Sequence, residues 1–374
     1  MPSGAARSRS WVTIARLDFE RFRAEFPVLA SRAYLNAGTD GPLPARAVEA
    51  ARARFEHELR EGRSGRVHWD GLDALCETTR SRLAALMGAS PDEVALTRSA
   101  TDAINLVLAG LTLGPGDELL TTDEEHPGLL APLAAFRRRT GVAVHVAPFD
   151  QVAEAAGDGT KLIAVSHISW MTGRRAAVES LHETGIPLLL DGAQGLGAVP
   201  VDVHALGCAF YAVAGQKWLC GPDGTGALFV AREWIERLGM PRPGYGTVRE
   251  ASDPLALEPR AGARCFDTGS PFGAALAAGL AALDVLEELG WDAVFERAGG
   301  GAQRLRNELG ELLASPSAAA PLVTWRTDSE PAEQVDRLAA RGVIVREIPG
   351  RPWLRASVGA WNSEDDLERL LAAL

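Results

Sequence analysis

The sequence predicts an α/β fold, with a mostly parallel β-sheet covered by helices and a smaller α+β unit after it. Two observations indicate this class. From residue 93 to residue 230, short apolar segments alternate with segments of helical periodicity, as in layered parallel sheets. After about residue 250, this alternation gives way to two long helices and two further strands. The length of 374 residues suits one large domain with a smaller one beside it.

The first elements precede this alternation. Apolar residues at helical spacing predict a helix over 18–29, which Pro27 should end early. A turn-rich loop is expected over 34–42, and two amphipathic helices are expected over 46–60 and 72–87.

The alternating region supplies the sheet. The expected strands cover 93–97, 118–121, 142–146, 162–166, 187–190, 210–213 and 226–230, and the expected helices cover 103–111, 128–140 and 178–184. The segments 162–166 and 187–190 are apolar throughout, which is typical of strands that are buried on both faces.

The C-terminal part has a different composition, rich in Ala and Leu. Its expected elements are helices over 274–289 and 292–313, strands over 322–325 and 343–347, and a last helix with Ser363 as its N-cap. We therefore divide the chain into an N-terminal extension (1–17), a large domain (18–255) and a small C-terminal domain (256–374).

The overall composition excludes several classes of function. The net charge of −11 argues against a nucleic-acid partner, which needs a basic face. No run reaches the roughly 18 apolar residues of a membrane span, and the first residues lack the apolar segment of a signal peptide. The four cysteines show no zinc-like spacing, so we expect reduced thiols in a cytoplasmic protein without a metal site.

Two charged residues follow apolar strands of the predicted sheet. Asp191 comes directly after 187–190, and Lys217 follows 210–213 in a segment of small residues. The carboxyl ends of parallel strands meet at one edge of a sheet, where ligands bind. A lysine in an apolar pocket becomes a nucleophilic amine, and a desolvated carboxylate needs a cation beside it. Taken singly, Lys217 could be a surface lysine and Asp191 could cap a turn.

Such a lysine and carboxylate are the pair that pyridoxal 5'-phosphate (PLP) requires. The lysine forms the Schiff base, and the carboxylate holds the protonated pyridine nitrogen. The segment 99–101 precedes a helix and could bind the phosphate with backbone N–H groups, although Thr101 could also be an ordinary cap. His126 could stack on the ring or be a structural histidine. The glycine-rich segment 221–226 precedes a strand rather than a helix, which argues against a dinucleotide-binding loop.

Eight segments, in order along the chain, carry a family resemblance: 34–44, 97–107, 125–132, 166–173, 191–198, 215–226, 266–271 and 354–362. On these segments the chain resembles the class V aminotransferase-like family of fold type I PLP enzymes. That family contains cysteine desulfurases, isopenicillin-N-epimerase-like enzymes, kynureninases and C–S lyases. The resemblance implies a seven-stranded sheet, a PLP cofactor, an amino acid or amine as substrate, and a homodimer with shared active sites.

The resemblance also implies a role for each matching residue. Lys217 would form the Schiff base, Asp191 would pair with the pyridine nitrogen, and Gln194 would bind the ring hydroxyl. His126 would stack over the ring, and Arg355 would clamp the substrate carboxylate. Further residues expected in the site are Ala100 and Thr101 at the phosphate, His167 and Gln216 beside the cofactor, Ser270 at the phosphate of the neighbouring subunit, and Asn36 at the substrate.

Three departures from the desulfurase pattern bear on the reaction. Gln216 stands where desulfurases have histidine, and His167 stands where they have asparagine. The resemblance places the desulfurase cysteine on a loop shortly before Arg355, but residues 341–352 contain no cysteine. We therefore expect transamination or β-elimination of the C–S lyase type. Desulfurase-like chemistry, epimerisation and a catalytically silent dimer are the alternatives.

Overall fold

A seven-stranded sheet forms the centre of the computed structural model, which describes residues 16–374 apart from 250–252, 254, 268 and 316–317. The strand order is β2-β8-β7-β6-β5-β3-β4. The strands are β2 (Val94–Thr97), β3 (Glu118–Thr122), β4 (Ala143–Ala147), β5 (Thr160–Ser166), β6 (Leu188–Asp191), β7 (Phe210–Ala214) and β8 (Gly226–Val230). Strand β8 runs antiparallel to both of its neighbours, and the other pairs run parallel. The prediction of a mostly parallel seven-stranded sheet is confirmed.

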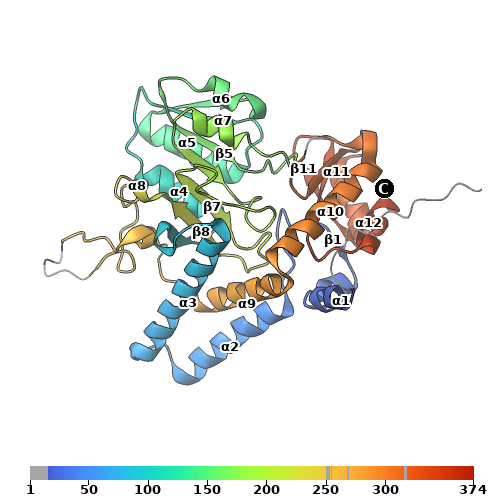
Figure 1. The fold of residues 1–374 in the computed structure, drawn as a ribbon, viewed down its shortest axis with the longest axis horizontal. Helices are drawn as coiled ribbons and strands as arrows, with labels where there is room; N and C mark the ends of the chain where they lie inside the picture. The colour runs from blue at the N-terminus through green and yellow to red at the C-terminus, as the bar shows by residue number, and fades with distance from the viewer. Residues whose placement is uncertain (1–15, 250–252, 254, 268, 316–317) are drawn as a thin grey trace, which may run out of the picture.

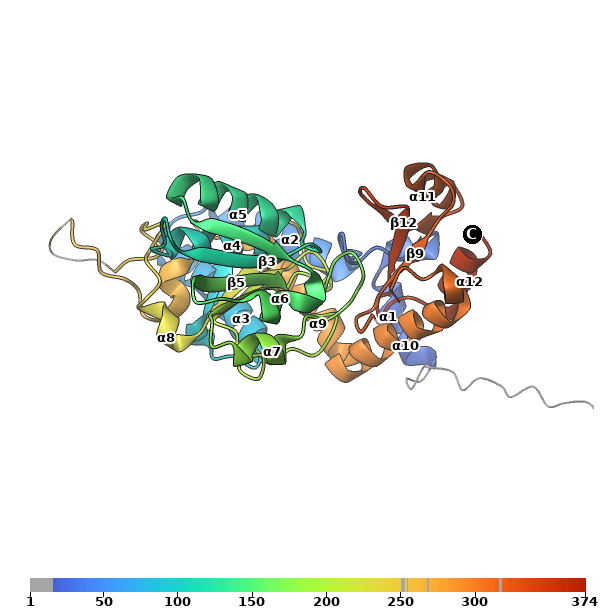
Figure 2. The ribbon, with the colours of Figure 1, turned by 90° about the horizontal axis from the view of Figure 1, so that it is seen from above.

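Helices cover both faces of this sheet (Figure 2). The helices are α4 (Ala100–Gly110) and α5 (Pro127–Thr140) on one face, and α3 (Gly65–Met87), α6 (Val152–Ala155) and α7 (Val178–Glu183) on the other. Strand β7 shows why the central strands are apolar throughout. Tyr211 and Val213 join the core on the α3 side, and Phe210 and Ala212 join the core on the α4 side.

Three long helices lie together beside the sheet (Figure 1). Helix α9 (Gly273–Leu289) packs along α2 (Ala45–Glu61) and against α3. The buried face of α9 includes Ala274, Ala278 and Ala282, whose small side chains let the neighbouring helices approach closely. Helix α10 (Trp291–Leu309) then leads the chain into the C-terminal unit.

The C-terminal unit is built on a three-stranded antiparallel sheet in the order β11-β12-β9. Its elements are β9 (Leu322–Arg326), α11 (Pro331–Ala340), β10 (Val343–Ile344), β11 (Arg346–Ile348), β12 (Trp353–Ser357) and α12 (Glu364–Leu371). The chain's first described elements, α1 (Arg16–Ala24) and β1 (Ala33–Tyr34), also lie here, because β1 pairs with β10 and Arg23 forms an ion pair with Asp366 at 2.7 Å. The predicted domain division at residue 255 stays a prediction, and most of the predicted extension lies outside the described residues.

Most predicted elements are present, with shifted ends. Helix α1 ends at Ala24, before Pro27, as expected. Helix α3 begins at Gly65 rather than at residue 72, because its first turns are mostly exposed and show no apolar periodicity. Helix α10 ends at Leu309 rather than at residue 313, since Gly310 takes a positive φ of 49° that breaks the helix.

Two smaller expectations concern individual side chains. Ser363 is the N-cap of α12 and forms a capping box with Asp366, as predicted. All four cysteines are free, and Cys220 and Cys265 are buried packing residues. Within the described residues, we find no helix that is both long and apolar enough to cross a membrane.

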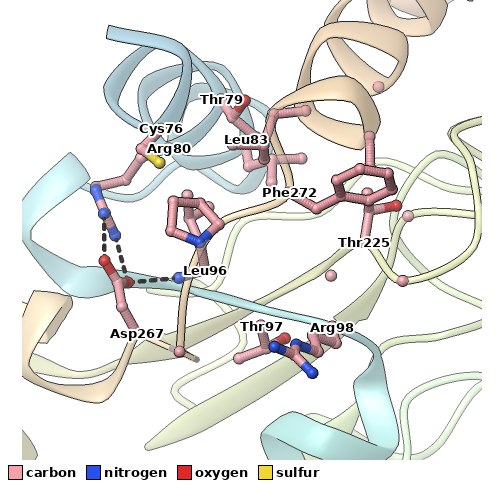
Figure 3. Close-up of a pocket in the computed structure, with 18 of the residues that line it drawn as sticks. Cys76, Thr79, Arg80, Leu83, Leu96, Thr97, Arg98, Thr225, Asp267 and Phe272 are labelled. Carbon is pink, nitrogen blue, oxygen red and sulfur yellow. Dashed lines mark hydrogen bonds and ion pairs between the residues drawn. The ribbon is translucent and has the colours of Figure 1, made fainter. Parts of the chain in front are cut away.

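A buried ion pair fastens the segment before α9 to the sheet (Figure 3). The guanidinium of Arg80, only 1% exposed, donates to the carboxylate of Asp267 at 2.8 and 3.0 Å and to the carbonyl oxygen of Val94. The same carboxylate accepts from the N–H of Leu96 at 2.8 Å. Asp267 thereby joins α3, β2 and the segment that carries Ser270.

Removing this carboxylate should destabilise the protein. We expect Asp267→Ala to lower the free energy of unfolding by about 3 kcal/mol, because it removes the closer carboxylate from the buried Arg80 charge and leaves it the half-exposed Glu77 at 3.4 Å. Urea denaturation followed by circular dichroism measures this. The control is Asp284→Ala, which removes the half-exposed partner of Arg82 and should cost less than about 1 kcal/mol. Equal losses in both variants would contradict the prediction.

Candidate active site

Lys217 lies in a tight turn after β7, at the carboxyl edge of the sheet. The turn is closed by the N–H of Gly221, which donates to the carbonyl oxygen of Gly215, and by Cys220, whose φ of 54° is left-handed. The sequence contains only one other lysine, Lys161, so a lysine in this turn is unusual for this chain. Lys217 keeps some contact with solvent but is surrounded by protein. Burial lowers the pKa of Lys217 to about 8, although the carboxylate of Asp191 raises it.

Asp191 is the last residue of β6 and is 6% exposed. Burial raises the pKa of Asp191, while the charge of Lys217 and the N–H of Ala193, which donates to Oδ1 at 3.0 Å, lower it. Asp191 and Lys217 influence each other's pKa without forming a direct ion pair. The structure therefore brings the two predicted residues to one edge of the sheet. Their charges are desolvated there and are not compensated by a direct ion pair between them.

Gln194 links this edge to the loop after β1. Its Nε2 donates to the carbonyl oxygen of Gly38 at 2.7 Å, and its Oε1 accepts from the indole N–H of Trp218 at 3.0 Å. The predicted partner of Gln194, a ring hydroxyl, stays a prediction. The amide is oriented by two neighbours, so Gln194 presents a fixed face to the site.

His126 is the N-cap of α5. Its Nδ1 accepts from the N–H of Gly128 at 2.9 Å, so the proton of the neutral ring is on Nε2. The ring meets the indole of Trp170 edge-to-face, with centroids 4.9 Å apart. Burial, followed by the charge of Lys217, lowers the pKa of His126 to about 4, so the ring is neutral at physiological pH.

Two arginines from the C-terminal unit reach the same place. Arg355 on β12 and Arg346 on β11 lie directly opposite each other in the antiparallel register. Arg355 is fully buried and donates to the carbonyl oxygen of Trp170 at 2.7 Å, and its Nε has no hydrogen-bond partner among the residues that the structure describes. Burial and the charge of Arg346 lower the pKa of Arg355 to about 9. Arg346 extends over the Trp170 ring at 5.5 Å.

The predicted phosphate residues lie at the start of α4. The N-cap is Ser99, whose hydroxyl accepts from the N–H of Asp102, so the suggestion that Thr101 caps this helix is corrected. The N–H groups of Ala100 and Thr101 belong to the first helical turn, which has no intrahelical acceptors. On the lysine turn, the Oε1 of Gln216 is buried without a partner.

Two other predicted residues have side chains bonded outside this group, although the N–H of His167 donates to the carbonyl oxygen of Asp191 at 3.0 Å. His167 is 1% exposed, and its Nδ1 lies 3.0 Å from the hydroxyl of Tyr211, which belongs to the core on the α3 side. Ser270 is exposed, and its hydroxyl hydrogen-bonds the hydroxyl of Tyr245. Asn36 lies beside the arginines, because it forms a bridge with Ser357 of β12.

A cavity of about 670 Å³ opens behind the lysine turn, between α3, α9 and the segment that carries Ser270 (Figure 3). Its walls include Gly215 and Thr225 of the turn, together with Thr97, Arg98 and Phe272. Lys217, Asp191 and His126 do not line it. The cavity therefore adjoins the candidate site without being the site.

Sequence analysis missed two charged residues of this region. Arg346 lies in the expected strand 343–347, to which the sequence assigned no functional side chain. Glu125, next to His126, is buried and accepts from the N–H of Ser166 at 3.0 Å and from the hydroxyl of Thr122 at 2.7 Å. Burial raises the pKa of Glu125 to about 7. A carboxylate directly before the predicted ring-stacking histidine was the available signal for Glu125.

The comparisons with known proteins agree with this geometry. The family model for aminotransferase class-V matches residues 33–324. The chain belongs to the aminotransferase class-V family. A probable cysteine desulfurase of Pseudomonas aeruginosa is 33% identical over 396 residues, covering 94% of this chain and 96% of that protein. A cysteine desulfurase of Cronobacter sakazakii is 28% identical, covering 96% of this chain and 97% of that protein.

Solved structures of class-V relatives are similar over the whole fold. A C-DES mutant with glycine covalently linked to its PLP cofactor has a TM-score of 0.89 and 26% identity, covering 94% of this chain and 98% of that one. The complex of the cystine C–S lyase C-DES with its reaction product, cysteine persulfide, has a TM-score of 0.88 and 26% identity, covering 93% of this chain and 98% of that one. This class-V chain is a PLP-dependent enzyme of fold type I.

The residues present fit PLP. The amine of Lys217 and the carboxylate of Asp191 lie at one sheet edge without direct contact, so a cation between them would satisfy the carboxylate. The first turn of α4 offers unpaired N–H groups to a phosphate. The buried Oε1 of Gln216 is a polar atom that still lacks a partner. Lys217, Asp191, His126, Gln194 and the start of α4 would hold the cofactor.

The lowered pKa of Lys217 can be measured directly. Competitive acetylation of the cofactor-free protein, read by mass spectrometry, should show Lys217 becoming reactive with a midpoint near pH 8, because only the neutral amine reacts. In Asp191→Asn the midpoint should fall further, since the carboxylate that stabilises the ammonium form is gone. Lys161, which is exposed, is the internal reference for reagent activity in each sample. No inflection below about pH 10, the ordinary lysine range, would contradict the prediction.

Proposed function

We propose that this class-V enzyme removes the Cα proton of an amino acid and eliminates a leaving group from Cβ, as a C–S lyase does. Lys217 is the single observation that carries the proposal. A pKa of about 8 leaves about a tenth of its amine neutral at pH 7, so it can act as a general base. PLP, when bound, supplies an electron sink that stabilises negative charge at Cα.

Three residues around Lys217 would contact the cofactor, and each has a different role. The buried carboxylate of Asp191 favours a positive charge on the group that it faces, which keeps the electron sink strong. His126 is neutral and fixed by its cap bond, so it offers a flat aromatic ring rather than a charge. Gln194, oriented by Trp218, donates beside the same edge.

Arg355 would bind the substrate carboxylate. Its side chain is fully buried and its Nε has no partner, which favours an incoming anion over a neutral group. Arg346 opposite adds a second positive charge. These two arginines favour an amino acid over a simple amine as substrate.

The proposed elimination is balanced without a further reactant except water. Lys217 takes the Cα proton, the released electron pair forms a Cα–Cβ double bond, and the leaving group departs from Cβ with its bonding electrons, as cysteine perthiolate from L-cystine or as chloride from β-chloro-L-alanine. Hydrolysis of the enamine product gives a 2-oxo acid and ammonia. The likeness to a cystine C–S lyase supports this outcome. Residues 341–352, which include β10 and β11, contain no cysteine to accept sulfur, which favours elimination over desulfuration.

The reaction can be tested on purified holoenzyme. With L-cystine or β-chloro-L-alanine, we expect pyruvate and ammonia in equal amounts. Lys217→Ala should lower turnover about 10²–10⁴-fold, because the general base is lost, and Lys161→Ala is the matched lysine control. Borohydride treatment should abolish the visible absorbance and fix the pyridoxyl group on Lys217. Conversion of the cofactor to its amine form without pyruvate would instead identify a transaminase.

We also propose that the enzyme is a homodimer with shared active sites. Several large apolar side chains on α2, α3 and the start of α9 are exposed. They are Phe55 (52%), Leu59 (85%), Val67 (81%), Trp69 (50%) and Phe272 (59%). The rings of Phe55 and Phe272 are 5.8 Å apart, beside the cavity that Ser270 lines. A second copy of the chain would cover this patch, and exposed Ser270 could then reach the partner's α4.

Analytical ultracentrifugation tests the dimer. The wild type should sediment at about twice the chain mass of 39.6 kDa. The double variant Phe55→Asp/Phe272→Asp should sediment as a monomer, because two buried carboxylates would disrupt the apolar contact. Val146→Asp changes an exposed apolar residue of β4 and should leave the mass unchanged. A monomeric wild type would exclude shared active sites.

A further inference from the structure

Arg346 and Arg355 form a cationic pair, and no acidic side chain among the described residues is in contact with either of them. They face each other across β11 and β12, and the charge of Arg346 helps to lower the pKa of Arg355. Within the described part of the chain, Arg355 donates to two neutral oxygens, those of Trp170 and Thr39. Arg346 likewise donates to the carbonyl oxygen of Glu347 and to Thr39. Two close guanidinium groups in a buried setting favour an anion between them.

The hydroxyl of Thr39 lies between these two guanidinium groups. Its Oγ1 accepts from Nη1 of Arg346 at 3.3 Å and from Nη2 of Arg355 at 3.5 Å. Its one proton goes to Oδ1 of Asn36 at 2.8 Å. The lone pairs of the hydroxyl therefore face both arginines. Both distances exceed the usual 2.7–3.2 Å of an N–H···O bond, so these are weak contacts.

The loop that carries Thr39 is pressed against Arg355. A Cβ added to Gly38 would lie 2.6 Å from Oγ of Ser357 and 2.8 Å from Nη2 of Arg355, so a larger residue there would displace these side-chain ends. The carbonyl of Gly38 is held by Gln194, and the N–H of Gly41 donates to the carbonyl oxygen of Gln216 at 2.8 Å. The loop is thus anchored on the cofactor side while Thr39 covers the arginines.

We propose that the Thr39 hydroxyl occupies the anion position between Arg346 and Arg355 in the free enzyme, and that the substrate carboxylate displaces it on binding. Thr39 is then a specificity-determining residue that sets the affinity for carboxylates by competition. A carboxylate makes shorter, charge-assisted bonds to both guanidinium groups and replaces two long neutral contacts. This inference rests on the proposed role of Arg355 in binding the substrate carboxylate.

Removal of the competing oxygen should tighten carboxylate binding. Propionate is a suitable probe because it carries the carboxylate but no amine, so it binds without reacting. Calorimetry on the holoenzyme should give a Kd for propionate about fivefold lower in Thr39→Val, which keeps the side-chain shape but lacks the hydroxyl. Thr39→Ser keeps the hydroxyl and should leave the Kd within about twofold of wild type. Damage to the loop alone would weaken binding, so a gain in affinity separates competition from a structural role.

Thr39→Ala gives a second hydroxyl-free variant, and the proposal requires tighter propionate binding there as well. Unchanged or weaker binding in these variants would overturn it. Arg355→Ala distinguishes this failure from failure of the proposed function. If Arg355→Ala abolishes propionate binding while Thr39→Val has no effect, only the role of Thr39 is wrong. If Arg355→Ala binds propionate like the wild type, or if the wild type binds none, the carboxylate site and the role of Thr39 fall together.

Discussion

The desolvation of Lys217 is the constraint on which the site depends. An ammonium group in these surroundings loses the stabilisation of its hydration shell. The charge of Asp191 compensates for this loss only in part, because the two side chains are not in direct contact. The amine therefore gives up its proton more readily than an ordinary lysine. Lys217 occupies this position because β7 ends at the carboxyl edge of the sheet. The chain then forms a tight turn there, closed by the hydrogen bond between Gly221 and Gly215. The sheet thus fixes both the place and the reactivity of the amine.

The loop after β1 connects the two halves of the site. It begins where β1 pairs with β10 of the C-terminal unit and then crosses to Gln194 at the edge of the large sheet. Gly41 completes the crossing, since a Cβ there would lie 2.1 Å from the carbonyl oxygen of Lys217. One short segment therefore positions the arginines relative to the lysine. A shift of the C-terminal unit relative to the large sheet would therefore change the distance between the arginines and Lys217.

The local charge of the site differs from that of the whole chain. The net charge is −11, yet Lys217, Arg346 and Arg355 converge within one buried region. Low dielectric surroundings strengthen these charges toward a bound group. The positive charges of the site favour the carboxylate of the proposed amino-acid substrate, whereas the net negative charge of the chain does not contribute to this attraction.

The sequence by itself determined the α/β class, the seven-stranded sheet and the approach of Lys217, Asp191 and His126 to one edge, because strand ends of a parallel sheet converge whatever the loops do. It also indicated Arg355 through family likeness. Only the tertiary structure decided the rest. Arg346 lies in an expected strand and Thr39 in a segment of the family resemblance, but the sequence assigned neither a role. Their proposed importance arises from the pairing of β11 with β12 and from the crossing loop. Periodicity reports which side chains are buried, whereas contacts between distant segments depend on how those buried faces pack.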